Sequence, residues 1–440
     1  MKRSSHVLWL LATVFCSALN AQTSYQELRI MSYNLLSYRT TNGQCTGNNN
    51  NPTNKDAYLK DIVQYIDADI LVCNEIGSQT VNSDRILTNA LNTSGVTRWN
   101  KAEYSNNGSN LVNMLFYDST LVGLRSQFSL DRDLQNNSLV RVIDFYRLYY
   151  KDPALKLGGD TTFFVVGAAH LKAGSSSSDE QERARATLAV MEYLKNSVSD
   201  EAVLFCGDLN VYSSNEGAFQ NLVSYSTASE RFYDPINSLG GWNNSPLFAS
   251  IHTQSTRSGN TNSGCFSSGG CDDRFDFILM SNKMLNDPSF MVQYVANSYE
   301  TIGNDGLHFN KGLKDLPTNV SAPSSIIDAL YNMSDHLPVS AVIKVAKLGL
   351  NLNEDKVSLQ FSFVNPVDSR LEVFIQSNRP LEECQIEVQN LQGQILLSEA
   401  FQTDANGMFR FNHDFNFKSG VYLISLIQNG YKFTKRAVKK

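Results

Sequence analysis

The chain has 440 residues, of which 42% are hydrophobic and 18% charged, a balance that excludes a largely disordered protein. Its formal net charge of −6 excludes a strongly basic nucleic-acid binder, although a bound divalent cation can still attract a phosphodiester. The length predicts one large domain followed by a smaller one.

The first 21 residues have the pattern of a secretory signal peptide. Lys2 and Arg3 form a basic start, and the apolar run 7–15 is too short to span a membrane. The small residues of SALNA (17–21) predict cleavage before Gln22, with cleavage after Ala18 as an alternative. A buried N-terminal helix is the alternative to a signal peptide. Since no later stretch is apolar enough for a membrane helix, we expect an exported protein without stable membrane insertion.

Between residues 22 and 347, apolar runs of strand length alternate with amphipathic helical patterns. The predicted strands are 27–36, 68–76, 111–119, 161–171, 202–210, 275–281 and 337–345, and the predicted helices include 54–68 and 179–196. Nearly continuous apolar strands between such helices are typical of sheets buried on both faces. The pattern therefore predicts an α/β domain.

After about Lys347 the apolar residues alternate with a period of two. The segments 357–376 and 385–401 predict strands, and Asn429-Gly430 predicts a hairpin turn. We expect a linker over 348–356 and a small all-β sandwich over 357–440.

The cysteines allow a disulfide if the protein is exported to an oxidising compartment. Cys265 and Cys271 flank the flexible stretch FSSGG, so we predict that these two can form a disulfide. Cys73 and Cys206 lie in apolar strands and are predicted to be buried thiols. Cys45 receives no assignment. The sequence contains no CxxC pair, so no structural zinc site is expected.

Polar residues stand at the ends of several predicted strands. GDLN places Asp208 and Asn210 two residues apart, just past a buried strand, so both side chains point the same way. Ligand sites of α/β sheets form at that edge, although an isolated pair of this kind is more often a helix cap or Asx-turn. The other strand-end or strand-embedded polar residues are Asn34, Glu75, His170, Asp276, Asp335 and His336. Their recurrence favours one common site, because polar groups in apolar surroundings need a partner or a metal.

The ordered series SYNLL, NEIG, HLKAG, GDLN, RFDFI and SDHLPV resembles the endonuclease/exonuclease/phosphatase superfamily, the DNase I-like fold, over residues 27–346. The resemblance implies an α/β, four-layer sandwich of two mixed β-sheets flanked by helices, with the site at one end between the sheets. The superfamily includes nucleases, sphingomyelin phosphodiesterases and inositol-phosphate phosphatases.

The resemblance also implies a cation site. Glu75 resembles the metal ligand, with Asn34 and Asp335 beside it. Carboxylate and carboxamide oxygens suit hard cations, so we expect Mg²⁺, with Mn²⁺ or Ca²⁺ as alternatives.

The remaining matched positions imply catalytic roles. Asp208 and Asn210 resemble the pair that orients and polarises the attacking water, and His170 resembles the histidine that stabilises the phosphate. Asp276 resembles the carboxylate that holds His336, and such a carboxylate fixes the tautomer and raises the basicity of the ring. Whether Asp208 or His336 takes the proton of the water stays open.

Two basic residues are candidates for phosphate contact. Lys172 shares the side of the strand end that carries His170, and the alternative is a solvated surface lysine. Arg141 suits bidentate contact, with Arg147 as an equal rival and a structural role as the alternative for both. Some members of the superfamily buttress the first histidine with a second carboxylate. The segment 105–117 offers no acidic residue for this, so the partner of His170 stays open.

The segments NPVDSRLEVFI, LQGQILLS and SGVYLISLIQNGYKFTKRAVKK resemble the sorting domain of the type IX secretion system over residues 352–440. The alternative is a carbohydrate-binding or immunoglobulin-like sandwich. The resemblance implies a Gram-negative source, export through the periplasm, and a secreted or surface-held product that contacts the secretion machinery.

These observations lead to one hypothesis. We expect a secreted, monomeric, divalent-metal-dependent phosphodiesterase, with extracellular DNA or RNA as the substrate. The alternatives are a sphingomyelinase-like lipid phosphodiesterase or phosphatase, and a surface binding protein without catalytic activity.

Overall fold

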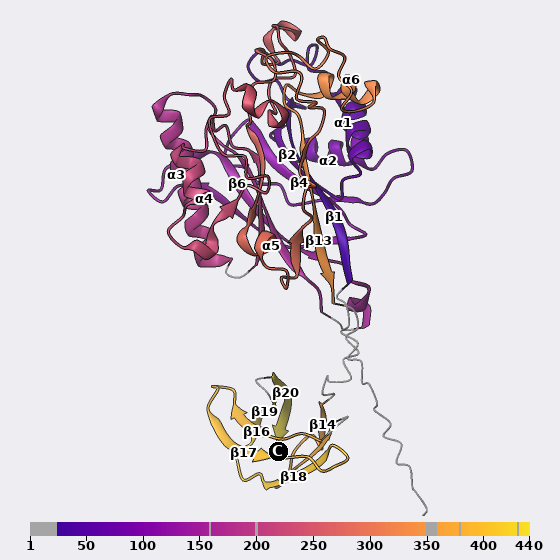
Figure 1. The fold of residues 1–440 in the computed structure, drawn as a ribbon. Coiled ribbons are helices and arrows are strands. Elements are labelled where there is room, and N and C mark those ends of the chain that lie inside the picture. Colours follow the sequence, from indigo (N-terminus) through magenta and orange to yellow (C-terminus); the bar gives the residue numbers. More distant parts are fainter. Residues whose placement is uncertain (1–23, 158–159, 199–200, 349–358, 378–379, 429–430) are drawn as a thin grey trace, which may run out of the picture. The chain divides into compact units, whose positions relative to one another are not determined.

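The computed structural model describes residues 24–157, 160–198, 201–348, 359–377, 380–428 and 431–440. The predicted signal peptide, most of the predicted linker and the Asn429-Gly430 turn lie outside the described residues. The chain divides into two compact units, residues 1–350 and 351–440 (Figure 1). The division falls within the segment predicted as a linker.

Two mixed sheets form the centre of the first unit. The first sheet runs in the order β11 (Val292–Tyr294), β13 (Val339–Lys347), β1 (Ser24–Tyr38), β2 (Ile70–Gly77), β4 (Leu111–Asp118) and β3 (Trp99–Lys101), with β12 (Glu300–Thr301) also paired to β13. The second runs in the order β5 (Val122–Arg132), β6 (Ser138–Tyr150), β7 (Phe163–His170), β8 (Ala202–Asp208), β10 (Asp276–Ser281) and β9 (Phe232–Tyr233). The β1–β2 and β7–β8 pairs are parallel, and the other pairs are antiparallel.

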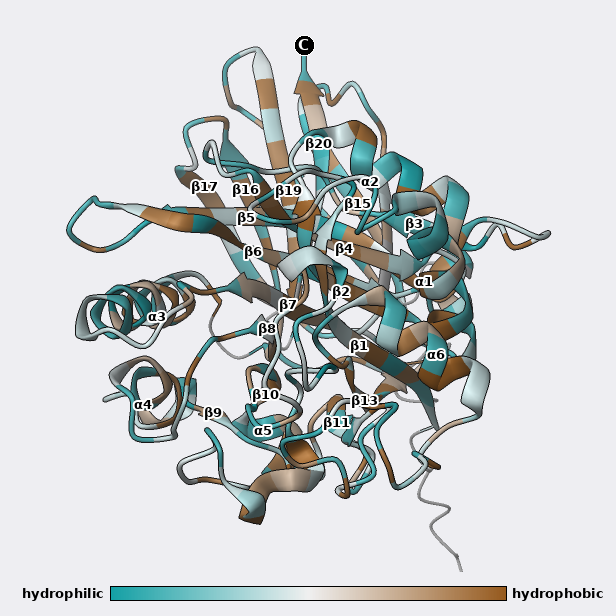
Figure 2. Cartoon of the chain, turned by 90° about the horizontal axis from the view of Figure 1, so that it is seen from above, coloured by the Kyte–Doolittle hydropathy of each residue, from teal (hydrophilic) through white to brown (hydrophobic). Residues whose placement is uncertain are grey.

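Helices cover the outer faces of both sheets. On one side lie α1 (Pro52–Ile66), α2 (Thr80–Ile86) and α6 (Ser324–Met333), and on the other α3 (Ser177–Ser197) and α4 (Gly217–Val223) (Figure 2). The short α5 (Asn282–Asn286) follows β10, and short 3-10 or π segments occur at Leu87–Leu91, Pro153–Leu157, Ala228–Glu230, Pro246–Ile251 and Asn262–Gly264. The result is the predicted four-layer sandwich.

Local sequence explains why these elements form where they do. Every residue of β8 is buried, which matches the continuous apolar run that predicted a strand covered on both faces. The helix α1 starts at an Asn51 cap followed by Pro52, and α3 starts with a capping box between Ser176 and Asp179. Both helices lie within a few residues of their predicted bounds.

The strand directions bring one end of each sheet to the same place. The parallel strands β7 and β8 finish together, with His170 opposite Asp208. The antiparallel strand β10 begins there, with Asp276 opposite Asp208. In the other sheet β1 and β2 run to the same end, where Asn34 lies opposite Asn74. Residues far apart in the sequence therefore share one edge of the sandwich.

The second unit is an all-β sandwich with a hydrophobic core of its own. One sheet contains β14 (Leu359–Phe363), β15 (Arg370–Ser377) and β18 (Met408–Asp414), and the other contains β17 (Ile395–Phe401), β16 (Cys384–Asn390), β19 (Gly420–Gln428) and β20 (Tyr431–Lys439). All of its strand pairs are antiparallel, which confirms the predicted class.

The predicted disulfide is wrong. Cys265 is bonded to Cys45, which lies 220 residues earlier in the chain, and Cys271 is a free, buried thiol. The backbone of Cys271 is held elsewhere, since its N–H donates to the Lys311 carbonyl. The predicted buried thiols Cys73 and Cys206 are confirmed.

Gly207 allows β7 and β8 to approach closely just before Asp208. Its φ is +132°, and a Cβ atom there would lie 1.9 Å from the carbonyl oxygen of Ala169. We expect Gly207→Ala to lower the free energy of unfolding by about 3 kcal/mol, because the backbones cannot separate without breaking the ladder. Urea unfolding followed by tryptophan fluorescence measures this unit, since Trp99 and Trp242 lie in it and residues 351–440 contain no tryptophan.

The matched control is Gly47→Ala, where an added Cβ meets nothing within 4 Å. Its effect should stay within about 0.5 kcal/mol. Equal effects of the two substitutions would contradict the role given to Gly207.

Candidate functional site

The side-chain amide of Asn34 joins the two sheets at their shared end. Its Nδ2 donates to Glu75 Oε1 and to Asp208 Oδ2, both at 3.0 Å, and lies 3.5 Å from His336 Nε2. Its Oδ1 accepts the N–H of Leu36 at 3.0 Å, and this bond orients the amide. The structure thus brings Asn34, Glu75, Asp208 and His336 together, although they are up to 302 residues apart.

Glu75 reaches this position from an irregular part of β2. Its backbone has φ +59°, and the pairing of β2 with β4 shifts register between Cys73 and Ile76. The N–H of Ser37 donates to Glu75 Oε2 at 2.9 Å, so both carboxylate oxygens have a partner. A non-glycine residue in this region of the backbone map costs free energy and is often found at functional sites.

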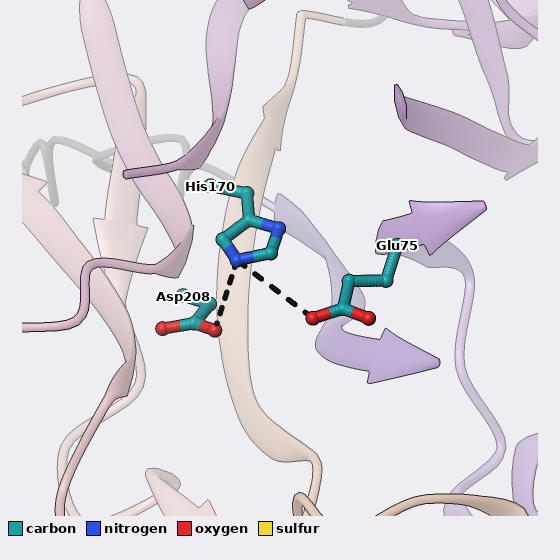
Figure 3. Close-up of side chains that lie close together, drawn as sticks. All are labelled: Glu75, His170 and Asp208. Carbon is teal, nitrogen blue, oxygen red and sulfur yellow. Dashed lines mark ion pairs between the residues drawn. The ribbon is translucent and has the colours of Figure 1, made fainter. Parts of the chain in front are cut away.

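Glu75, His170 and Asp208 form a cluster of the size that a metal ion needs. Their potential ligand atoms all lie within 4.8 Å of one another. Nε2 of His170 lies 3.4 Å from Asp208 Oδ2 and 3.8 Å from Glu75 Oε1, and Figure 3 shows it between the two carboxylates. Two carboxylates and one imidazole nitrogen are a donor set for divalent cations, so these residues fit the cation that the family resemblance implies.

His170 is neutral in this arrangement. Burial lowers its pKa well below the ordinary value, and the charges of Arg141 and His336 lower it further. Its Nδ1 has no hydrogen-bond partner within the described ranges, which matches the missing acidic residue noted in segment 105–117. A neutral ring leaves Nε2 able to act as a ligand.

Asp276 and His336 form a second pair beside the cluster. His336 Nδ1 lies 2.7 Å from Asp276 Oδ2, the contact that the family resemblance implies. Burial opposes the charged ring, but the carboxylates of Asp276 and Asp208 raise the pKa of His336 well above its ordinary value. Nε2 of the same ring lies 2.7 Å from the side-chain amide of Gln254. No pattern in the sequence indicates Gln254, because it lies in a polar loop without a strand pattern.

Asp208 has an unusual protonation equilibrium. Burial raises its pKa to about 7, the charges of Asp276 and Glu75 raise it as well, and His336 and Asn34 oppose the rise. Four acidic side chains, those of Glu75, Asp208, Asp276 and Asp335, lie in this region. Within the described chain, Asp276 Oδ1 and Asp335 Oδ1 accept no hydrogen bond although they are buried. Such a site gains stability from a cation.

Backbone contacts fix the strand ends that carry these groups. The N–H of Asp208 donates to Asn74 Oδ1 at 3.1 Å, while Asn74 Nδ2 donates to the Ala169 carbonyl at 3.1 Å. Thr253 Oγ1 accepts the N–H groups of Phe275 and Asp276. Sequence reasoning missed Asn74, for which the available signal was a carboxamide inside an apolar strand.

The other predicted residues make contacts within the protein. Asn210 donates its N–H to Asp208 Oδ1 at 3.0 Å and its Nδ2 to the Leu171 carbonyl at 3.3 Å. Arg141 Nη1 donates to the carbonyls of His170 and Leu171.

Lys172 and Asp335 are likewise bonded to neighbouring parts of the chain. Lys172 Nζ lies 2.8 Å from Asp179 Oδ1, and Asp335 Oδ2 accepts the Ser267 N–H at 2.9 Å. Arg141 and Lys172 therefore support the loop after β7 in this state.

The sequence from residue 31 to residue 336 matches the model of the Endonuclease/Exonuclease/phosphatase family. The chain belongs to this family. The comparison of this chain with curated proteins found no match.

Solved structures with a similar chain trace come from several organisms. The human Nocturnin catalytic domain is 12% identical, with a TM-score of 0.43 and 73% of this chain and 96% of that chain covered. TDP2 from D. rerio, complexed with a single-strand DNA product, is 14% identical, with a TM-score of 0.44 and coverages of 72% and 98%. A mannosyl-6-phosphatase from Bacteroides thetaiotaomicron is 14% identical, with a TM-score of 0.44 and coverages of 72% and 99%.

Residues 363–440 match the Secretion system C-terminal sorting domain, which confirms the predicted sorting module. A domain of this kind indicates that the protein interacts with the secretion machinery and is exported, and that it is then released or held at the cell surface. Within the ranges that the structure describes, no helix has the length and apolar character needed to cross a bilayer.

The raised pKa of Asp208 predicts a pH-dependent stability of the cation-free protein. Because the folded state binds this proton more tightly than the unfolded state, stability falls as the pH rises from about 4 to 7. We expect Asp208→Asn, in chelator at about pH 8, to raise the free energy of unfolding by about 2 kcal/mol. This is less than the pKa shift alone would give, because the substitution also weakens the contacts of residue 208 with His336 and Asn34. Urea unfolding by tryptophan fluorescence measures the change.

The pH-dependent part of the difference between Asp208→Asn and wild type should vanish below about pH 3, where the carboxyl is protonated in both the folded and the unfolded state. A variant that is less stable than wild type at about pH 8 in chelator would contradict this account.

Proposed function

We propose that the protein is an exported, divalent-cation-dependent phosphodiesterase that cleaves DNA or RNA. The observation that carries the proposal is the placement of the Glu75–His170–Asp208 cluster beside the Asp276–His336 pair, with the Asn34 amide between them. One site thus combines ligands for a cation with a group that exchanges a proton.

The cation would be held by Glu75, His170 and Asp208, with Asn34 and Asp335 at its margin. When bound, it would neutralise charge on the phosphate oxygens and promote ionisation of water. The oxygen donors favour Mg²⁺ and the imidazole favours Mn²⁺, so we expect both to support activity.

The chain's own residues supply orientation and proton transfer. The Asp276 carboxylate holds His336 through Nδ1 and leaves Nε2 facing the site, where it can give or take a proton. Asp208 and Asn210 orient water, and Gln254 fixes the plane of the His336 ring. Arg141 and Lys172 lie at the strand end of His170, where release from their present partners would let them contact phosphate.

The proposed substrate follows from the compartment. A sorting domain and a predicted signal peptide support export, and polymeric DNA and RNA are phosphodiesters available outside cells as nutrient or matrix. The same site chemistry serves a phosphatase or a lipid phosphodiesterase, so the substrate panel below includes both. We propose that the enzyme acts as a monomer.

Cation removal should abolish activity. We expect EDTA to eliminate hydrolysis of bis-p-nitrophenyl phosphate and of plasmid DNA by the mature protein, and Mg²⁺ or Mn²⁺ to restore both. Undiminished activity in chelator would exclude the cation-dependent mechanism.

Substitutions should separate the cation ligands from the proton-transfer group. Glu75→Gln and His336→Ala should each lower kcat/KM by about 10²–10⁴-fold, but only Glu75→Gln should also weaken Mn²⁺ binding. The control is Asp131→Asn, whose carboxylate is 57% exposed on β5 and which should retain full activity. Wild-type rates in Glu75→Gln would contradict the proposal that Glu75 is a ligand of the cation.

A substrate panel tests the nuclease assignment. We expect cleavage of plasmid DNA or RNA at rates well above those for p-nitrophenyl phosphate or sphingomyelin, measured with equal enzyme and Mg²⁺. Hydrolysis of the monoester or the lipid alone would replace the nuclease by a phosphatase or a lipid phosphodiesterase, respectively.

A further inference from the structure

A disulfide joins two loops beside the site that are far apart in the sequence. Cys45 lies in the loop that follows β1, and Cys265 lies in the loop that leads toward β10, 220 residues later. Both loops, TNGQCTGNNN (41–50) and SGNTNSGCFSSGG (258–270), are rich in glycine, asparagine and serine. Chains of this composition lose much conformational entropy when they are ordered.

Few other contacts hold these loops together. Asn49 Nδ2 donates to the Asn262 carbonyl and Asn262 Nδ2 donates to the Asn49 carbonyl, both at 2.9 Å, and both bonds are exposed to solvent. The two bonded cysteines also belong to a small buried apolar cluster with Leu36 and Phe266. The covalent bond therefore carries most of the constraint between the loops.

The first loop is continuous with the backbone that orients two site residues. The N–H of Leu36 donates to Asn34 Oδ1, and the N–H of Ser37 donates to Glu75 Oε2. Asn50, five residues after Cys45, donates its Nδ2 to the carbonyls of Leu36 and Ser37. A displacement of this loop would thus release the groups that aim Asn34 and Glu75.

The second loop orients a third site residue. The N–H of Ser267, two residues after Cys265, donates to Asp335 Oδ2 at 2.9 Å, and the Ser267 carbonyl accepts the Ser255 hydroxyl. Phe266 is packed against the Arg257 guanidinium, 3.9 Å from the ring centre. The disulfide thus lies next to the backbone contacts of three predicted metal ligands.

We propose that the Cys45–Cys265 disulfide is a positioning element that the cation site requires, so that the protein becomes a competent enzyme only after oxidation outside the cytoplasm. The expected loss of activity rests on the proposed function, whereas the expected loss of cation affinity does not require that the protein be an enzyme. Bond formation removes two protons and two electrons from the two thiols, and the disulfide of an oxidised thiol carrier, such as glutathione disulfide, accepts them and becomes two thiols.

The test compares the mature full-length protein in three forms: oxidised wild type, wild type reduced by a phosphine and alkylated, and the Cys45→Ser/Cys265→Ser double variant. Mn²⁺ affinity is measured by the EPR signal of free Mn²⁺, and kcat and KM are measured with bis-p-nitrophenyl phosphate. We expect both disulfide-free forms to bind Mn²⁺ at least about ten-fold more weakly and to lose kcat. Reduced, unalkylated wild type should recover both properties with glutathione disulfide.

Two controls keep the test decisive. Cys384→Ser removes a buried thiol from the second unit and should leave Mn²⁺ affinity and kcat unchanged. Tryptophan fluorescence shows whether the first unit is folded, and the reduced wild type replaces the double variant if the latter does not fold.

Three results would contradict either the positioning role of the disulfide or the proposed function. Folded, disulfide-free protein with wild-type Mn²⁺ affinity and kcat would overturn the positioning role. Peptide mapping that finds Cys265 bonded to Cys271 would overturn it as well. Oxidised wild type that binds Mn²⁺ but hydrolyses no phosphoester would instead overturn the proposed function and leave the positioning role to be judged by Mn²⁺ affinity.

Discussion

The site depends on keeping like charges close together in a region shielded from water. The carboxylates of Glu75 and Asp208 both accept a hydrogen bond from the amide of Asn34. Their mutual repulsion is strong because little solvent is available to screen it, so a donor or a cation must offset the cost. The rest of the first unit can be understood as the scaffold that holds these groups in place.

Hydrogen bonds from neighbouring segments hold the strand ends of that scaffold in place. Asn74 fixes the backbone of Asp208 from the neighbouring sheet, and Thr253 fixes the start of β10. Groups preorganised in this way need little rearrangement when charge develops on a substrate, which is the main source of electrostatic catalysis. Crowded carboxylates lower the stability of the fold, and such a loss of stability is common at active sites.

Much of this arrangement was accessible from local sequence patterns. Asp208 and His170 are candidates because each ends a continuous apolar run and such strands end at a common edge, and the family resemblance supplies their predicted roles. The strands β5 and β6 were not predicted because charged residues interrupt their apolar pattern. The bond between Cys45 and Cys265 was missed for a different reason: it joins loops whose sequences carry no periodicity, so only the folded chain brings them together.

The order of the site residues along the chain has a consequence for biosynthesis. Asn34 emerges early from the ribosome, whereas His336 and its neighbour Asp335 come roughly three hundred residues later and complete the constellation. A nascent or truncated polypeptide that stops short of them lacks the Asp276-bound imidazole. The order of the chain therefore delays assembly of the site until most of the first unit has been synthesised, because an unfinished copy lacks some of the groups that form it.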